Sequence, residues 1–233
     1  MISDFTALDI ETTGLDPKRD KIIEIGALRI RNGKVKDRLE TMVHPGRRLE
    51  ERITELTGIT DDDLKDAPTA AQVIPKLLEF IGEDVLLGHR IMFDYSFVKR
   101  AAVNLNLNFE KQGIDTLKLA RRFLPELEKK SLVFLCNYYQ IELQAHRAGN
   151  DALAAAELYF KLAGQFPDED AFDPFPLIYK VKKEGPITEK QKERLYKLIE
   201  QHKLVIDYEI DMLTRNEASR ITDKIILQYG REL

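Results

Sequence analysis

The sequence lacks several features that would place it in a common class of protein. Its single cysteine, Cys136, excludes an internal disulfide and a cysteine-rich zinc site, and it lies in an apolar stretch where we expect a small core residue. No apolar run reaches the roughly eighteen residues that a membrane-spanning helix needs, and the first residues do not resemble a signal peptide. We therefore predict a cytoplasmic protein with no membrane partner.

The sequence also lacks an excess of positive charge. Its formal net charge is −4, which gives no overall attraction to nucleic acid. Bound metal cations would neutralise a cluster of acidic side chains locally, so this balance does not exclude a polynucleotide substrate. With 43% hydrophobic and 33% charged residues, the chain has the composition of a globular protein with a core of its own.

Strand patterns come first along the chain, and helix patterns follow. Residues 21–30 and 34–43 are β-rich runs joined by an Asn-Gly pair, which is typical of a tight hairpin. Residues 85–88 form a short apolar strand pattern. Helices are predicted within residues 49–66, 69–81, 93–105, 116–123, 131–139 and 151–163. This order predicts an α/β domain with a mixed sheet over residues 1–165.

The composition changes after residue 165. Four prolines and an acidic run predict a linker, or an extension draped over the domain, at residues 166–186. Beyond it, two helix-start signatures and two apolar-periodic runs predict a small helical hairpin at residues 187–233. A module of this size would be only marginally stable alone.

The predicted hairpin carries two capping boxes and a basic stripe. Thr188 with Gln191, and Thr214 with Glu217, have the spacing at which a helix N-terminus caps itself. Between residues 180 and 203 the basic residues outnumber the acidic ones. The stripe either guides a nucleic-acid strand through phosphate contacts or is a solvated helix face with paired charges.

Two acidic residues, Asp9 and Glu11, come directly after the apolar run at residues 5–8. Residues i and i+2 of an extended chain point to the same face, so the two carboxylates would lie side by side at the end of a buried strand. Like charges there are costly unless a cation lies between them, and carboxylate oxygens suit Mg²⁺ or Mn²⁺. The alternative is a pair of exposed acids, so a metal site needs further ligands.

Three residues further along the chain are candidates for the same site. Asp94 opens a predicted helix after the strand at residues 85–88, and ligands gather at strand ends in α/β folds. His146 precedes Asp151, which opens an alanine-rich helix. Each has a structural alternative, because acids stabilise helix N-termini and most single histidines are surface or core residues.

Taken together, these segments resemble the DEDDh branch of the 3′–5′ exonucleases, the group that contains the proofreading epsilon subunit of bacterial DNA polymerase III. The resemblance covers residues 5–164. Its three motifs are matched by Asp9-Ile10-Glu11-Thr12-Thr13-Gly14, by His89 with Phe93-Asp94 and Phe97, and by His146-Arg147-Ala148 with Asp151. Arg90 departs from the pattern, because asparagine is usual after the histidine of the second motif.

The resemblance implies a ribonuclease H-like mixed sheet, with the first strand central, flanked by helices. It also implies a two-metal mechanism, in which Asp9 bridges two Mg²⁺ or Mn²⁺ ions and Glu11, Asp94 and Asp151 complete their ligands. His146 would then be the general base, because the usual histidine pKa of about 6.5 suits proton transfer near neutral pH. The predicted site is therefore assembled from residues far apart in the chain.

The implied substrate is the 3′ end of single-stranded or frayed DNA, from which 5′-mononucleotides would be released. The resemblance places Thr12, Thr13, Gly14 and Leu15 around the terminal nucleotide, although Leu15 could instead be an ordinary packing residue. Arg90 either contacts a phosphate or points to solvent. Alternatives are an RNA-directed enzyme of the same family and a catalytically silent nucleic-acid-binding or replisome-tethering subunit. Association with a DNA polymerase subunit is left open.

Overall fold

A computed structural model describes residues 1–166 and 169–230. Residues 167–168 of the predicted linker, and residues 231–233 of the predicted hairpin module, lie outside the described residues. No helix in the described part combines the length and apolar composition that crossing a bilayer requires.

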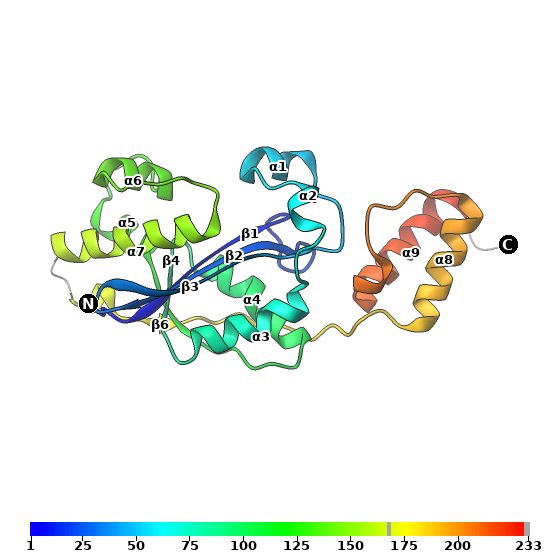
Figure 1. The fold of residues 1–233 in the computed structure, drawn as a ribbon, viewed down its shortest axis with the longest axis horizontal. Coiled ribbons are helices and arrows are strands. Elements are labelled where there is room, and N and C mark those ends of the chain that lie inside the picture. Colours follow the sequence, from blue (N-terminus) through cyan, green and yellow to red (C-terminus); the bar gives the residue numbers. More distant parts are fainter. Residues whose placement is uncertain (167–168, 231–233) are drawn as a thin grey trace.

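A six-stranded mixed sheet forms the centre of the larger part of the molecule, with the strand order β3-β2-β1-β4-β5-β6 (Figure 1). The first three strands form an antiparallel meander, β4 and β5 continue parallel to β1, and β6 is antiparallel to β5. Their bounds are Phe5–Thr12, Ile22–Arg31, Lys34–Met42, Leu86–Gly88, Gln112–Asp115 and Phe175–Pro176. The predicted mixed sheet with an interior first strand is confirmed.

The turn between β2 and β3 explains the hairpin that the sequence predicts. Asn32 and Gly33 both have positive φ, at 51° and 71°. A two-residue turn with positive φ at both positions matches the twist of the flanking strands, and Asn-Gly is the pair that adopts it most readily.

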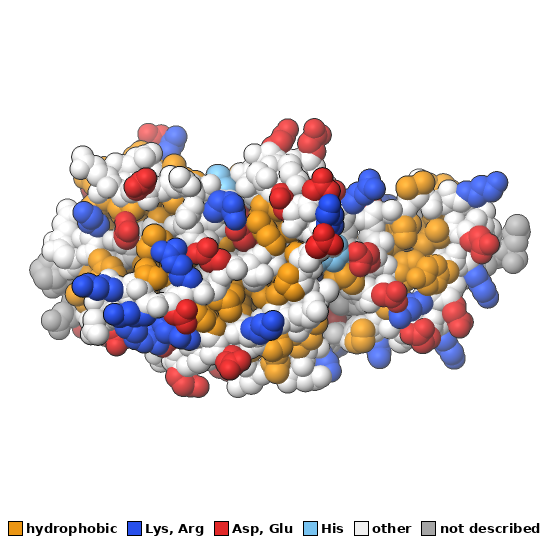
Figure 2. All heavy atoms as spheres, in the orientation of Figure 1, with side chains coloured by type: hydrophobic (Ala, Val, Ile, Leu, Met, Phe, Trp, Pro, Cys, Tyr) orange, Lys and Arg blue, Asp and Glu red, His pale blue; other side chains and the backbone are white. Residues whose placement is uncertain are grey.

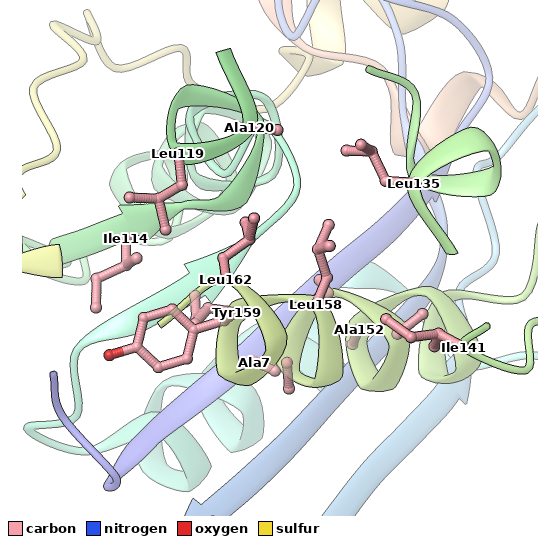
Figure 3. Packing of buried hydrophobic residues seen from close by; sticks show 14 of the residues in the cluster. Ala7, Ile114, Leu119, Ala120, Leu135, Ile141, Ala152, Leu158, Tyr159 and Leu162 are labelled. Carbon is pink, nitrogen blue, oxygen red and sulfur yellow. The ribbon is translucent and has the colours of Figure 1, made fainter. Parts of the chain in front are cut away.

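Helices cover both faces of the sheet (Figure 1). One hydrophobic cluster joins α3 and α4 to one face, and a second joins α5, α6 and α7 to the other. Figure 3 shows the second cluster, where Leu158 and Leu162 of α7 lie among side chains from the neighbouring helices. The helices are α1 Glu51–Thr57, α2 Asp61–Leu64, α3 Ala70–Ile81, α4 Met92–Asn104, α5 Thr116–Phe123, α6 Leu132–Tyr139 and α7 Ala148–Gln165.

Two strands were missing from the sequence-based prediction. β5 is short and mostly polar at its start, so it carries no apolar alternation. β6 lies in the proline-rich segment that was expected to be a linker or a draped extension. Its pairing with β5, and the burial of Phe172 and Leu177, show that the described part of this segment lies along the domain.

The C-terminal residues form a separate hydrophobic cluster around α8 (Glu189–His202), the short 3₁₀ turn η2 (Ile210–Met212) and α9 (Arg215–Tyr229). Both predicted capping boxes are present, one at the start of α8 and the other at the start of α9. We call residues 187–230 the C-terminal module, and the predicted boundaries of the units at residues 165 and 187 stay predictions.

Candidate active site

Three carboxylates from two elements meet at the end of β1. Asp9 and Glu11 lie on the strand, and Asp151 lies in the first turn of α7. One oxygen from each lies within 4.8 Å of the others. Such a set of carboxylate oxygens has the chemistry and spacing to hold a divalent cation of the Mg²⁺ or Mn²⁺ type.

The alternation of β1 places the two acids under α7. Phe5 and Ala7 pack in the cluster of α7, and Leu8 and Ile10 pack in the cluster of α3 and α4. Since every second residue of a strand shares a face, Asp9 continues the row of Phe5 and Ala7 toward α7. The local sequence therefore determines which helix can complete the site.

A glycine on the neighbouring strand lets α7 approach closely. Gly26 of β2 pairs with Asp9, and a Cβ atom added there would lie 2.2 Å from the backbone nitrogen of Gly149. The first turn of α7 thus rests directly on the sheet beside Asp9, which brings Asp151 within reach of the strand. A side chain at position 26 would push this turn away.

Asp94 reaches the site from the other layer of helices. It lies in the first turn of α4, is 3% exposed, and accepts a 3.0 Å hydrogen bond from the backbone nitrogen of Ile10. Ile10 lies between Asp9 and Glu11, so this bond holds the Asp94 carboxylate beside the pair. The sequence placed Asp94 at a helix start, and the structure brings it to the predicted carboxylates.

His146 lies in the loop before α7, with its side chain exposed and its φ at 66°. Positive φ is uncommon for a residue with a side chain. A 2.9 Å hydrogen bond from its backbone nitrogen to Oδ2 of Asp151 holds the loop in this conformation. His146 and all four acids line one cleft of about 310 Å³.

The electrostatics of the cleft favour a bound cation. Burial, followed by the charges of Asp94 and Asp151, raises the pKa of Asp9 well above its usual value. Burial and the charge of Asp151 raise the pKa of Glu11 to about 7, and burial also raises the pKa values of Asp94 and Asp151. The ionised carboxylates therefore repel one another, and divalent cations between them would offset this repulsion.

A family model for RNase T exonucleases matches residues 6–159. The chain belongs to this exonuclease family. The membership and the ribonuclease H-like fold expected from the three motifs are thus confirmed.

The relatives with high identity are much longer than this exonuclease-family chain. A DNA polymerase III of the PolC type from Caldanaerobacter subterraneus subsp. tengcongensis is 43% identical over 160 residues, which cover 68% of this chain and 11% of the relative. The PolC-type polymerase of Bacillus subtilis is 43% identical over 162 residues, covering the same 68% and 11%. That of Oceanobacillus iheyensis is 32% identical over 240 residues, covering 96% of this chain and 17% of the relative.

Two solved structures share the arrangement of the exonuclease-family domain. Exonuclease X in complex with 5′ overhanging duplex DNA has a TM-score of 0.56 and 25% identity, over 70% of this chain and 92% of that chain. A zinc-bound E. coli exonuclease I with single-stranded DNA has a TM-score of 0.65 and 19% identity, over 72% of this chain and 42% of that chain. The second similarity shows the fold alone.

Glu24 is a site residue that the sequence analysis missed. It pairs with Glu11 across β1 and β2 and is 5% exposed. Its carboxylate accepts hydrogen bonds from Nε of Arg147 at 3.0 Å and from the backbone nitrogen of Ala148 at 3.1 Å. It therefore anchors the start of α7. The available signal was an acid within a strand that is otherwise apolar at this end.

Asp115 is a second residue that the sequence analysis did not assign to the site. It does not line the cleft in the described structure, but it bonds to the backbone of Arg90, which does. It caps α5 and also accepts a 3.0 Å hydrogen bond from the backbone nitrogen of Arg90, whose φ is 75°. Next to it, His89 lies 2.9 Å from the hydroxyl of Thr116 and 2.9 Å from the carbonyl of Lys130. Burial lowers the pKa of His89, so this motif residue is a neutral structural link.

The predicted substrate-binding residues divide into two groups. Leu15, which is 80% exposed, and Arg90 line the cleft. Thr12, Thr13 and Gly14 are buried and do not line it in the described structure. The Thr12 hydroxyl donates to the carbonyl of Gly14 at 2.6 Å, so this side chain shapes the loop that presents Leu15.

Proposed function

We propose that this chain is a metal-dependent 3′–5′ exonuclease that releases 5′-mononucleotides from single-stranded or frayed 3′ ends, with DNA favoured. The observation that carries the proposal is the convergence of four carboxylates and a histidine on one cleft within an exonuclease-family fold. Convergence of hard oxygen ligands beside a general base is the arrangement that phosphodiester hydrolysis requires.

Each residue has a defined part in this reaction. Asp9, Glu11, Asp94 and Asp151 would hold two divalent cations, which polarise the scissile phosphate and activate the attacking water when bound. An imidazole nitrogen of His146 would accept the proton of that water. Leu15 would pack against the terminal base, and Arg90 would contact a phosphate. Backbone and stacking contacts of this kind make an exonuclease tolerant of sequence.

The preference for DNA and the polymerase partner also belong to the proposal. The relatives are DNA polymerases by name, and the structural neighbours contain DNA. We infer that the domain acts on 3′ ends made available by a DNA polymerase. Because RNA differs from DNA by the 2′-hydroxyl, matched DNA and RNA oligomers distinguish the two substrates.

The test is hydrolysis of DNA and RNA oligomers labelled at the 5′ end, with Mg²⁺, with Mn²⁺ and with a chelator. The expected result is a ladder of DNA products shortened one nucleotide at a time from the 3′ end, which the chelator abolishes. Faster shortening of RNA would reverse the substrate preference. Binding without hydrolysis under every metal condition would instead support the silent-subunit alternative.

A further inference from the structure

A second groove lies between the exonuclease-family domain and the C-terminal module. It has a volume of about 670 Å³. One wall comes from the loop after β3, and the other comes from α9 and the chain before η2. Figure 1 shows the module beside the end of the sheet that carries this loop. The groove shares no lining residue with the catalytic cleft in the described structure.

Backbone pairing joins the two walls. The backbone nitrogen of Arg48 donates to the carbonyl of Asp207 at 2.8 Å, and that of Glu209 donates to the carbonyl of Gly46 at 2.7 Å. On the α9 side, Lys21 forms a 2.7 Å ion pair with Glu217, which also completes the capping box of α9. These contacts fix the positions of the two walls relative to each other in the folded chain.

The groove is basic although the chain as a whole is acidic. Its charged lining residues are Arg19, Lys21, Arg47, Arg48, Arg220 and Lys224 against Glu50, Asp207 and Glu217. In the view of Figure 2, basic and acidic side chains are interspersed over most of the surface, apart from a run of basic side chains at the lower left. The groove is therefore a local site of attraction for a polyanion.

Three of these cations are available to a ligand. Arg48, Arg220 and Lys224 are exposed, and none forms a salt bridge within residues 1–166 and 169–230. Arg220 and Lys224 lie four residues apart on α9, so both project from the same helix face as Glu217. Tyr229, 47% exposed, adds an aromatic ring to this wall. Cations along a groove with aromatic rings suit single-stranded nucleic acid.

One loop connects the groove to the catalytic cleft. Thr13 lines the groove, and Leu15, two residues later, lines the cleft. A strand whose terminal nucleotide packs on Leu15 can therefore continue past this loop into the groove. We propose that the groove binds the phosphate backbone of the single strand that leads to the scissile end. This inference rests on the proposed exonuclease function.

The test reverses the two exposed α9 charges with the double variant Arg220→Glu and Lys224→Glu. Hydrolysis is compared on an oligodeoxythymidylate of about twenty nucleotides, which exceeds the usual site size of a single-strand-binding fold, and on the p-nitrophenyl ester of thymidine 5′-monophosphate. The ester has no upstream nucleotides. The expected result is a rise in KM for the oligomer of about tenfold with a weaker salt dependence, since phosphate contacts are lost. Hydrolysis of the ester stays unchanged.

A matched control reverses Lys190 and Lys197 on α8, two exposed lysines of the same module that do not line the groove. This variant should leave the oligomer KM unchanged. An equal rise in both variants would overturn the groove as the site and favour the basic stripe at residues 180–203 or a non-specific effect. If polyglutamate bound the groove and the double variant still degraded the oligomer normally, the occupant would be an acidic protein segment, and the proposal would be wrong.

The ester also separates this inference from the proposed function. If the unmodified protein hydrolysed neither the ester nor the oligomer with Mn²⁺, the exonuclease proposal would fail. If it hydrolysed both and the double variant matched it on the oligomer, only the groove proposal would fail.

Discussion

The cleft lined by the four acids and the basic groove lie on either side of one loop and have opposite electrostatic character. In the cleft, burial and then the charges of neighbouring carboxylates raise the pKa values of Asp9 and Glu11. In the groove, exposed Arg48, Arg220 and Lys224 have no described counterions. An acidic cleft without cations would repel a phosphate, whereas the groove would attract it.

A nuclease must both carry out chemistry and bind a long polyanion, and these two requirements fall on different parts of the molecule. Chemistry requires closely spaced ligands, whose mutual repulsion lowers the stability of the domain until cations bind. Binding of a long polyanion requires only exposed cations along a path, at little cost to the fold. The following predictions test the division, beginning with the largest effect.

Asp9→Asn should reduce turnover by at least about 10³-fold, because the cations supply several kcal/mol of transition-state stabilisation. It should also raise the melting temperature of the metal-free protein, since one of several repelling carboxylates is removed. Steady-state kinetics and thermal melting with a chelator measure the two effects. Asp66→Asn, on the exposed surface, is the control. Full turnover in Asp9→Asn would remove this residue from the site.

His146→Ala should reduce turnover by about 10²-fold, the contribution of a positioned general base. Mn²⁺ should still bind, because the four acids remain. The rise in melting temperature on addition of Mn²⁺ measures this binding. His202→Ala in the C-terminal module provides a matched loss of a histidine outside the cleft. Normal hydrolysis by His146→Ala would show that another group accepts the proton.

Glu24→Gln should reduce kcat about tenfold with little change in KM, because Glu24 positions the start of α7 rather than the substrate. The stability of the metal-free protein should change little. Loss of the ion pair with Arg147 lowers stability, whereas removal of the Glu24 charge relieves its repulsion of Asp9 and Glu11 and raises stability. The two effects oppose each other.

The control for Glu24→Gln is Asp37→Asn. Asp37 lies on β3 and forms a surface ion pair with Arg29, which lies on β2 as Glu24 does, so this variant also removes one carboxylate charge. Its effect on stability should stay below about 0.5 kcal/mol. A change in KM but not in kcat for Glu24→Gln would contradict the positioning role.

The metal-free protein should lose stability as pH rises. The pKa of Glu11 is raised from 4.5 to about 7 in the folded state, so the folded protein holds a proton that the unfolded chain releases earlier. Its stabilising contribution is therefore present below pH 4.5 and is lost as pH rises through about 7. Thermal melting with chelator should show a fall of a few degrees across this window, and Mn²⁺ should remove it. A melting temperature that rises over the window would refute the raised pKa.

Local patterns were sufficient for several elements. The Asn-Gly pair predicted the β2–β3 turn, and the Thr-x-x-Gln and Thr-x-x-Glu spacings predicted the starts of α8 and α9. The spacing of Asp9 and Glu11 predicted two carboxylates on one strand face. In each case the stabilising interaction joins residues a few positions apart, so a short stretch of sequence is enough to predict the element.

Other features depended on contacts between distant segments. β5 and β6 pair with each other although each is short and weakly patterned. α7 begins at Ala148, three residues before the predicted start, because Glu24 accepts the hydrogen bond of its first residue. The groove exists only because the loop at residues 46–48 pairs with the chain at residues 207–209.

By itself, the sequence of this chain determined the family, the mixed-sheet fold and which five residues are candidates for catalysis, because ordered motifs and strand alternation are local. Only the tertiary structure decided that Asp94 and Asp151 approach one strand from opposite layers, that Glu24 anchors α7, and that a basic groove borders the cleft. The physical reason is that burial and charge proximity are properties of distances in space, which Gly26 and the docking of the C-terminal module set.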